Sequence, residues 1–598
     1  MILWVALAIP GYALVRRLIP EEMKSGFFGV LAVSYLGTFT LLAPISILCY
    51  LLRAPVMAIS VAMVALIVMG AGYLSWRRGW GALVKSVRPV LVLPLLIIAV
   101  NMVMSARSGS LLTGDTRTHV SRVRFIVDHG ITNEEPYVGK GYFFPPYHTN
   151  LLHAVLAGIV RLTGADALSV WFVSRAWALL VTFCGMYYLG FALFDKQWIA
   201  AAAALFYLAA QAPVPFLIYP NKIAPFWLLP MMGAFAVEVF RSGFSWRTPA
   251  KLAAGSFVLG QVHGLYAIFA GVLVAPALVV VLAARLRSRP RESKLVMACL
   301  LALLGGAPFV LIAKFSMNRA GAPEASWIER DETVVHRYYH FDNGWKMLQP
   351  GDPSRYQLLA LGVLCGLASD RRKQAAVVIA GVGAAATIAF VPPVCTLALK
   401  VFGPPHTVYR LLGLIQTVTF VLAPGAVAYL AAAFFKRWWQ QTLAGAVVFF
   451  GGMNLATGSN DSWRAYWASA TADRATRHRA LNDLQKRAAF FEEHIPRGAV
   501  VLTHERTAMD LVMLHDCHVV IHLRLTQGIT DAAQREEDYA ALVAPETPQD
   551  VRKQLLKKYD VEYFLVDGYL QSTWQWARPY MGEYWQIPGY LLIKLKLD

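Results

Sequence analysis

Two adjoining stretches decide the fold: "PVLVLPLLIIAVNMVMSA" at residues 89–106 and "LLTGDTRTHVSRVRFIVDHG" at residues 111–130. The first is apolar and close to the roughly 20 residues that a helix needs to cross a bilayer. The second carries a dense set of ionisable side chains, namely Asp115, Arg117, His119, Arg122, Arg124, Asp128 and His129. Together they predict a membrane span followed by a polar helix at the membrane surface.

Composition extends this pattern to the whole chain. Of its 598 residues, 57% are hydrophobic and only 15% are charged, whereas a soluble domain has about 25% charged residues. The sequence therefore predicts a polytopic α-helical membrane protein. By apolar length we expect about fourteen spans, at residues 1–15, 27–52, 55–75, 89–106, 168–194, 199–213, 222–241, 250–262, 266–284, 295–314, 357–369, 375–392, 410–434 and 441–457.

The net charge of +19 comes largely from short basic clusters between the apolar runs, at residues 15–18, 76–80, 284–294, 370–374 and 435–440. Basic residues in short loops mark the cytoplasmic face, so this charge predicts orientation and contact with membrane lipids, not binding of nucleic acid. All five clusters share one face if residues 147–162 form a helix on the membrane surface rather than a span. The opposite, outer face then receives the polar segments 107–167, 315–356, 393–409 and the tail from 458.

The tail has a different character from the rest of the chain. A helical pattern at residues 474–495 precedes three short apolar runs, "GAVVLT" (498–503), "CHVVIH" (517–522) and "VEYFLVD" (561–567). Helical patterns near 506–515 and 548–559 lie between these runs. Buried strands that alternate with helices predict a small α/β domain with a parallel sheet. No glycine-rich phosphate loop follows a strand, so we expect no nucleotide there.

This layout resembles the GT-C superfamily of membrane glycosyltransferases, which includes aminoarabinose, mannosyl and arabinosyltransferases. The resemblance rests on the acidic start of the first outer loop, the Pro-Pro motif in "YFFPPYHTNLLHAVLAGIVRLTG", the segment "APVPFLIYPNKIAP" (212–224) and the tail motifs "IPRGAVVLTHE" and "LLKKYDVEYFLVD". It implies extra N-terminal helices at residues 1–88, a catalytic membrane core at 89–457 with outer loops 107–167 and 315–356, and a periplasmic α/β domain at 458–598.

The resemblance also implies a reaction: transfer of a sugar from a polyprenyl-phosphate donor to a glycan, lipid or protein acceptor on the outer face. Its expected catalytic base is Asp115, by position in the first outer loop. An inverting transfer needs a base for the acceptor proton and cations for the departing phosphate. Asp115 followed at helical spacing by His119 and Arg122 suits that need. An alternative role for Asp115 is to cap a helix that begins near Thr116.

Other polar residues on the outer face are further candidates. For the donor phosphate we expect Arg410, Lys222, Arg122 and Arg117. The alternative for Lys222, Arg122 and Arg117 is anchoring at the membrane interface. For substrate contacts we expect His119, Tyr147, His148, His263, His406, Tyr409, Glu329 and Arg330. The alternatives are structural histidines and, for Glu329 and Arg330, a solvated loop. Arg410 begins a span, and an Arg at membrane depth needs a partner such as a phosphate.

Metal dependence and localisation complete the expectations. We predict no metal site, because no pair of carboxylates accompanies Asp115 and the six cysteines form no CxxC pair, although Mg²⁺ or Mn²⁺ at the phosphate stays open. The expected location is a bacterial inner membrane. A transporter or lipid flippase is the main alternative, but the sequence lacks the repeated halves common in transporters. A non-catalytic protein that binds envelope glycans is the third.

Overall fold

The structure is a computed structural model. It describes residues 1–77, 79–81, 86–107, 114–139, 142, 151–211, 217–241, 245–285, 290–312, 363–364, 366–367, 370–391, 393–395, 397–398, 410–411, 415, 421–429, 432, 436–444, 446–447, 468, 471, 474–522, 529 and 531–597. The expected outer loop 315–356 and most of the segment 393–409 lie outside the described residues.

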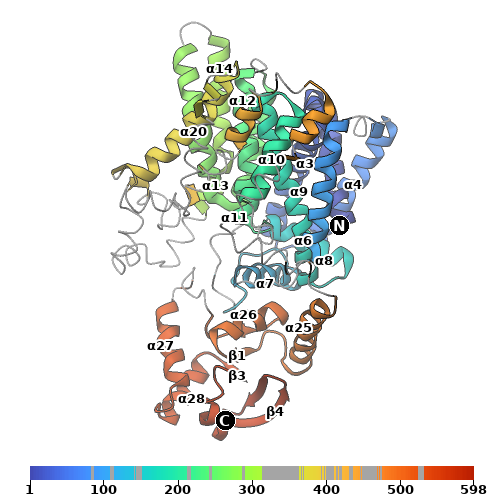
Figure 1. Cartoon of the computed structure of the whole chain (residues 1–598). Helices are drawn as coiled ribbons and strands as arrows, with labels where there is room; N and C mark the ends of the chain where they lie inside the picture. Colours follow the sequence, from blue (N-terminus) through green and yellow to red (C-terminus); the bar gives the residue numbers. More distant parts are fainter. Residues whose placement is uncertain are drawn as a thin grey trace.

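A bundle of helices forms the larger part of the molecule and the C-terminal residues form a separate layer beneath it (Figure 1). The bundle elements are α1 (Ile2–Ala6), α2 (Ala8–Leu18), η1 (Pro20–Ser25), α3 (Gly26–Leu51), α4 (Val56–Trp76), η2 (Pro89–Leu91), α6 (Val92–Arg107), α8 (Leu151–Thr163), α9 (Ala167–Phe194), α10 (Gln197–Gln211), α11 (Pro220–Ile223), η5 (Ala224–Leu228), α12 (Leu229–Arg241), α13 (Arg247–Arg285), α14 (Pro290–Ala302), η6 (Leu303–Gly306) and α20 (Arg372–Phe390). Helix α7 (Gly114–His129) lies between the bundle and the C-terminal layer.

Among the described residues, seven helical stretches are long and apolar enough to cross a membrane: Pro20–Leu51, Val56–Trp76, Pro89–Arg107, Ala167–Phe194, Pro220–Val239, Arg247–Ala283 and Glu292–Ile312. They confirm a predominantly helical membrane protein and coincide with eight of the expected spans, because Arg247–Ala283 covers both 250–262 and 266–284. The total of fourteen spans stays a prediction, because several expected spans fall on residues outside the described part.

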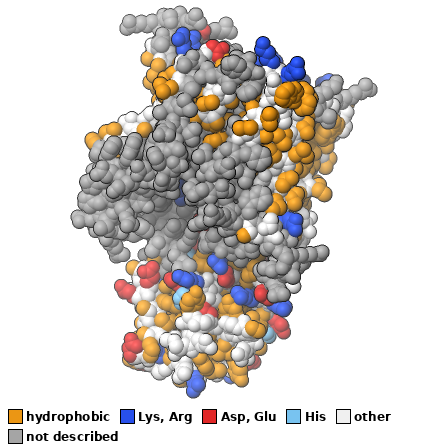
Figure 2. Space-filling model, viewed as in Figure 1, with side chains coloured by type: hydrophobic (Ala, Val, Ile, Leu, Met, Phe, Trp, Pro, Cys, Tyr) orange, Lys and Arg blue, Asp and Glu red, His pale blue; other side chains and the backbone are white. Residues whose placement is uncertain are grey.

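Burial distinguishes the centre of the bundle from its lipid-facing rim. Helix α9 is apolar on nearly every side. In its most apolar 18-residue stretch 94% is buried, compared with 22% in the corresponding stretch that contains α6. A helix that is apolar on every side belongs inside a bundle. The exposed side chains of α4 and α6, such as Val68 and Leu96, are also apolar. Orange side chains gather on the right-hand side of the upper part in Figure 2, as expected of a surface in contact with lipid.

The N-terminal helices pack into the same core as the central helices. The Trp4 indole donates to Ser174 Oγ at 2.7 Å and stacks on Trp177 with ring centroids 3.9 Å apart. Tyr35 Oη donates to the Trp4 carbonyl at 3.0 Å. The described side chains of residues 1–88 therefore share one hydrophobic core with the central helices.

The C-terminal layer contains a five-stranded sheet in the order β2-β1-β3-β5-β4. Its elements are α25 (Arg474–His494), β1 (Val500–Leu502), α26 (Glu505–Leu514), β2 (His518–Val519), α27 (Ala532–Val543), α28 (Gln549–Lys558), β3 (Val561–Val566), η7 (Trp574–Tyr580), β4 (Met581–Ile587) and β5 (Tyr590–Leu595). The three expected strands β1, β2 and β3 are present and parallel.

Two further strands extend the expected parallel part of the sheet, and β5 pairs antiparallel with both β3 and β4. Strands β4 and β5 form a hairpin in which Ile587 is opposite Tyr590. The turn between them is Pro588–Gly589, and Gly589 has φ +87°, a conformation that glycine adopts without steric cost. A Pro-Gly pair between two apolar runs is a turn signal.

The loop after α7 completes one edge of this sheet. The His518 amide donates to Ala499 O on the β1 side, and the next amide, of Val519, donates to Tyr137 O at 2.7 Å on the other side. The Tyr137 ring is fully buried and belongs to the same hydrophobic cluster as Phe491, Val501 and other C-terminal residues. The first outer loop is therefore an integral part of the C-terminal layer.

Candidate active site

Helix α7 carries Asp115 in its first turn. The described part of the helix begins at Gly114, and Asp115 is its second residue; the capping role stays an alternative. A carboxylate at this place interacts favourably with the positive end of the helix dipole. The Asp115 side chain is half-buried.

One hydrogen bond joins this turn to a distant part of the bundle. The hydroxyls of Thr116 and Tyr219 are 2.6 Å apart and both residues are buried. Tyr219 is the residue immediately before α11. The bond therefore fixes the residue next to Asp115 against the segment that carries Lys222.

Aromatic rings pack against the residues that form the Thr116–Tyr219 hydrogen bond. The His119 imidazole lies almost parallel to the Trp171 indole, with centroids 5.5 Å apart, and its centroid is 5.3 Å from that of Tyr219. Its Nδ1 is 3.0 Å from His153 Nε2 on α8. Burial lowers the pKa of His119 to about 3, so the ring is neutral. The structure buries His119 at 5% exposure, and its expected contact with substrate stays a prediction.

The segment after Tyr219 has an unusual backbone. Helix α11 passes into η5, a short π-helix at Ala224–Leu228, before α12 begins. Short π-helical turns widen the backbone and are frequent at functional sites. Lys222 lies just before this turn, and its Nζ is 5.7 Å from the centre of the Phe226 ring. The sequence predicted a cation here, but gave no sign of the π-helix.

Helix α13 bends sharply at His263, whose φ of −165° and ψ of 101° are not helical. A Cβ on Gly306 would lie 2.6 Å from both Ser256 O and Ala267 Cβ. In a straight helix these two residues would be about 16 Å apart, so the two halves of α13 fold back on each other. His263 therefore lies at the bend between two helical segments, where the sequence places it.

Two further contacts bring this bend to the Lys222 segment. Arg410 Nη1 is 3.4 Å from His263 Nε2, and Tyr266 Oη donates to the Asn221 carbonyl at 3.1 Å. The positive charges of Lys222 and Arg410 are close enough to repel each other. Two cations and an imidazole from three separate segments thus converge at the same end of the bundle as α7. Such a concentration of positive charge favours an anion, above all a phosphate.

Arg175 is a buried cation that the sequence analysis missed. It lies on α9 one turn from Trp171, is fully buried, and its guanidinium is 4.5 Å from the centre of the Phe172 ring. Its charge also interacts with Tyr219. An Arg inside an expected span is a functional signal in itself, and this rule would have identified Arg175 within residues 168–194.

Two arginines expected at the phosphate have other partners in the structure. Arg117 Nε is 2.5 Å from Asp510 Oδ1 on α26. Arg122 is buried and donates to the carbonyls of Thr132, at 2.6 Å, and Glu134. Both side chains organise the outer loop and its contact with the C-terminal layer. The phosphate-binding hypothesis therefore rests on Lys222 and Arg410.

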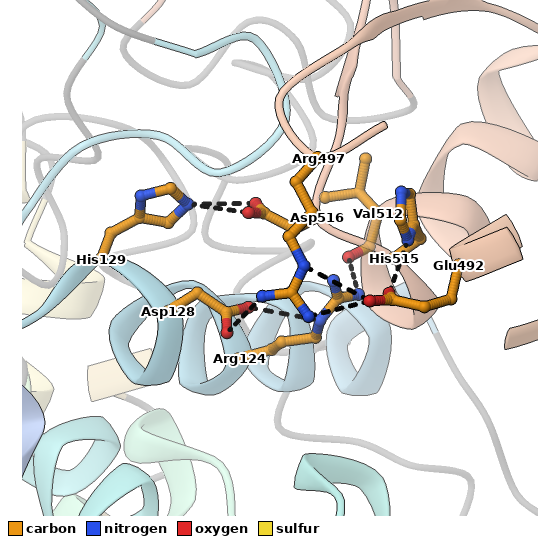
Figure 3. Close-up of polar contacts among 8 residues, drawn as sticks. All are labelled: Arg124, Asp128, His129, Glu492, Arg497, Val512, His515 and Asp516. Carbon is orange, nitrogen blue, oxygen red and sulfur yellow. Dashed lines mark hydrogen bonds and ion pairs between the residues drawn. The ribbon is translucent and has the colours of Figure 1, made fainter. Parts of the chain in front are cut away.

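The far end of α7 is fixed to the C-terminal layer by a set of polar contacts, drawn in Figure 3. Arg124 reaches the Val512 carbonyl at 3.4 Å, Asp128 is 3.7 Å from Arg497 Nη1, and His129 Nε2 is 3.1 Å from Asp516. Together with Arg117–Asp510 these contacts make up what we call the α7 interface. The helix that carries Asp115 is therefore held by the membrane core at one end and by the C-terminal layer along its length.

The α7 interface should loosen as pH rises. The hydrogen bond to Asp516 raises the pKa of His129 above 6.5, against the opposing effect of burial. A raised folded-state pKa means that the stabilisation is complete below pH 6.5 and is lost as pH rises through the folded value. The effect is below about 1 kcal/mol, because the His129 side chain is 43% exposed. Hydrogen exchange in the last turn of α7, corrected for intrinsic rates, measures it.

In this pH experiment, His129→Gln should abolish the pH dependence of the exchange rate. The control is His494→Gln, a substitution at the end of α25, which should preserve it. The same pH dependence in wild type and His129→Gln would assign the titration to another group.

The Thr116–Tyr219 bond should contribute measurably to stability. Tyr219→Phe keeps the ring against His119 and Trp171 but removes the hydroxyl partner of buried Thr116. The expected loss is about 1–2 kcal/mol, read as a lower unfolding temperature in detergent together with faster hydrogen exchange in the first turn of α7. Tyr584→Phe removes a hydroxyl from a 62% exposed residue and should change neither. Equal effects of the two substitutions would show that the 2.6 Å contact has no special role.

Several expected site residues cannot be placed. Tyr147, His148, Glu329, Arg330, His406 and Tyr409 all lie outside the described residues, and their roles stay predictions. Within the part of the chain that is described, no three His, Cys, Asp or Glu side chains gather as they would around a metal ion. A divalent cation at the phosphate also stays a prediction.

Comparison with solved structures places the fold. ArnT from Cupriavidus metallidurans bound to undecaprenyl phosphate superposes with a TM-score of 0.51, at 13% identity, over 84% of this chain and 97% of ArnT. The Archaeoglobus fulgidus oligosaccharyltransferase in complex with Zn and sulfate has a TM-score of 0.48, at 12% identity, over 83% of this chain and 72% of that protein. The chain therefore shares its overall fold with ArnT, in agreement with the sequence resemblance.

Comparison of sequences identifies the family. No curated protein matches the chain. One family model matches, and it spans residues 4–591, from the first helix to the last strand. Since this is nearly the whole chain, the protein belongs to the family of unknown function DUF6541.

Proposed function

We propose that this protein is a membrane glycosyltransferase that moves a sugar from a polyprenyl-phosphate donor to a cell-envelope acceptor, with inversion at the sugar. The observation that carries the proposal is the Thr116–Tyr219 hydrogen bond of 2.6 Å. It joins the turn of Asp115 to the segment of Lys222, beside the contact of His263 with Arg410. A carboxylate and a group of cations suited to a phosphate at one end of the bundle support this proposal.

The chemistry follows from these positions. The acceptor hydroxyl oxygen attacks the anomeric carbon from the face opposite the phosphate, and Asp115 accepts the proton of that hydroxyl. The bond between the anomeric carbon and the phosphate oxygen breaks, and the polyprenyl phosphate leaves with the bonding electrons. Lys222 and Arg410 stabilise its new negative charge. His263 orients Arg410, and neutral His119 keeps α7 at a fixed depth.

The fold neighbours support the donor class. ArnT is a protein bound to undecaprenyl phosphate in its structure, a lipid phosphate of the kind that Lys222 and Arg410 would hold. We further propose about fourteen spans, a periplasmic α/β domain and an active site on the periplasmic side of a bacterial inner membrane. The basic clusters of the sequence support this orientation. The sugar, hexose or pentose, and the acceptor, a glycan, lipid or protein, remain to be identified by experiment.

The direct test measures a product that does not depend on the sugar or the acceptor. Purified protein is incubated with a lipid extract that contains polyprenyl-phosphate sugars and envelope acceptors, and free polyprenyl phosphate is quantified by mass spectrometry. Time-dependent release that requires both donor and acceptor supports transfer. If no donor releases polyprenyl phosphate but the protein moves lipid-linked sugars across proteoliposome membranes, the function is that of a flippase.

A further inference from the structure

A cavity of about 790 Å³ opens at the opposite end of the bundle from α7. Two helices run from the end of the bundle near α7 to the end that contains the cavity. The 26-residue helix α3 ends near Ala54, whose carbonyl lies against Gly130 just after α7, and begins after Lys24 at the cavity. At 1.5 Å per residue the two ends are about 39 Å apart. Helix α9 runs from Trp171 at the site to Phe191 at the cavity in the same way.

Positive charge dominates the lining of the cavity. Lys24, Arg88, Lys196 and Lys436 line it, from four different segments of the chain. No described carboxylate forms an ion pair with any of the four. Asp195 is the acidic residue in the lining, and its carboxylate lies 3.8 Å from Arg371, which balances it. The cavity therefore carries a net positive charge that calls for an anion.

The wall also contains polar and apolar groups. Gln197 Nε2 donates to the Lys24 carbonyl at 3.4 Å, which fixes the amide, and its buried Oε1 has no hydrogen-bond partner among the described residues. Val90, Phe191 and Trp198 line the same cavity. A ligand with an anionic head and an apolar continuation would satisfy both kinds of surface.

The surroundings place the cavity at the level of lipid headgroups. Trp76, Trp246 and Trp438 are exposed by 72%, 67% and 61%. An arginine follows Trp76 and Trp246 in the sequence, and Arg437 precedes Trp438. Exposed Trp beside basic residues is typical of the membrane–water boundary. Basic cavities between helices at this boundary bind the headgroups of anionic lipids.

We infer that this cavity binds the phosphate headgroup of an anionic phospholipid, as a second lipid site separate from the proposed donor site. The lysines and Arg88 bind the phosphodiester, and the lipid chains extend along the apolar rim. A bound lipid would join η1, the α9–α10 turn and the segment before Gln441, so it would stabilise the bundle at this end. The inference does not depend on the proposed glycosyltransferase activity.

The test is lipid-dependent stabilisation of the full-length protein in detergent. Phosphatidylglycerol should raise the unfolding temperature and remain bound in native mass spectra, whereas zwitterionic phosphatidylethanolamine should do neither. The double variant Lys196→Gln/Lys436→Gln should weaken phosphatidylglycerol binding about 10-fold or more, as loss of two charge-assisted contacts implies. The matched control is Arg437→Gln, an exposed neighbour of Lys436 that does not line the cavity, and it should bind as wild type does.

Three results would overturn the inference. The first is an absence of any preference for phosphatidylglycerol. The second is an equal loss in Arg437→Gln, which would mean diffuse surface attraction. The third is equal stabilisation by inorganic phosphate or glycerol phosphate at matched concentration, which would assign the cavity to a soluble phosphate instead. If the double variant unfolds, single substitutions at Lys196 and Lys436 give the same comparison at smaller effect.

Discussion

Asp115→Asn should reduce the rate of sugar transfer by about 10²- to 10⁴-fold, the range typical for loss of a general base. The amide keeps the size of the carboxylate and its place in the first turn of α7 but cannot accept the acceptor proton. Affinity for polyprenyl phosphate should stay close to that of wild type, because the proposed phosphate ligands are Lys222 and Arg410. Initial rates of polyprenyl phosphate release, together with a separate binding assay, measure both quantities.

The matched control for this experiment is Asp128→Asn on the same helix. Asp128 lies at the far end of α7, where it faces Arg124 and Arg497, and its loss removes only partly exposed ion pairs worth at most about 1 kcal/mol. Its transfer rate should remain within about fivefold of wild type. Full activity of folded Asp115→Asn would exclude this residue as the base and direct attention to the carboxylates of residues 326–356.

Arg410→Gln and Lys222→Gln should each weaken binding of polyprenyl phosphate by about 10- to 100-fold, since a hydrogen bond to a charged group contributes about 1.5–3 kcal/mol. The two side chains come from different segments but their charges interact, so both would bind one phosphate. A titration with polyprenyl phosphate, followed by intrinsic tryptophan fluorescence or native mass spectrometry, gives the affinities.

The double variant distinguishes one shared phosphate from two separate sites. If one phosphate bridges both cations, the double variant should lose less than the sum of the single losses, because the first substitution already disrupts the shared geometry. Lys557→Gln, an exposed lysine on α28, should leave affinity unchanged. Wild-type affinity in both single variants would remove Lys222 and Arg410 from the donor site and with them the main electrostatic support for the proposed reaction.

The membrane part of the fold was predictable because apolar length alone identifies a span. Helices α3, α4 and α9 begin and end within two residues of the expected limits. The tail was partly predictable for a similar reason, since β1 and β3 are short apolar runs between helical patterns. The hairpin of β4 and β5 was missed, although its Pro-Gly turn is visible in the sequence.

The candidate site was less predictable because its key contacts join residues far apart in the chain. Asp115, Lys222 and His263 stand out as polar residues beside apolar runs. The hydrogen bond from Thr116 to Tyr219 spans 103 positions, and no local pattern reveals such a pairing. The contact of His119 with His153, 34 positions away, was unpredictable for the same reason.

The pairing of Tyr137 with Val519 has a practical consequence for biochemistry on the C-terminal layer. A fragment cut before α25 would leave the outer edge of β2 without its partner and would open a hole where the Tyr137 ring is buried. Unpaired sheet edges promote aggregation, so such a fragment would be poorly soluble even though its own sheet is intact. Joining residues 131–142 to its N-terminus through a flexible linker would restore the missing edge and the missing ring in one step.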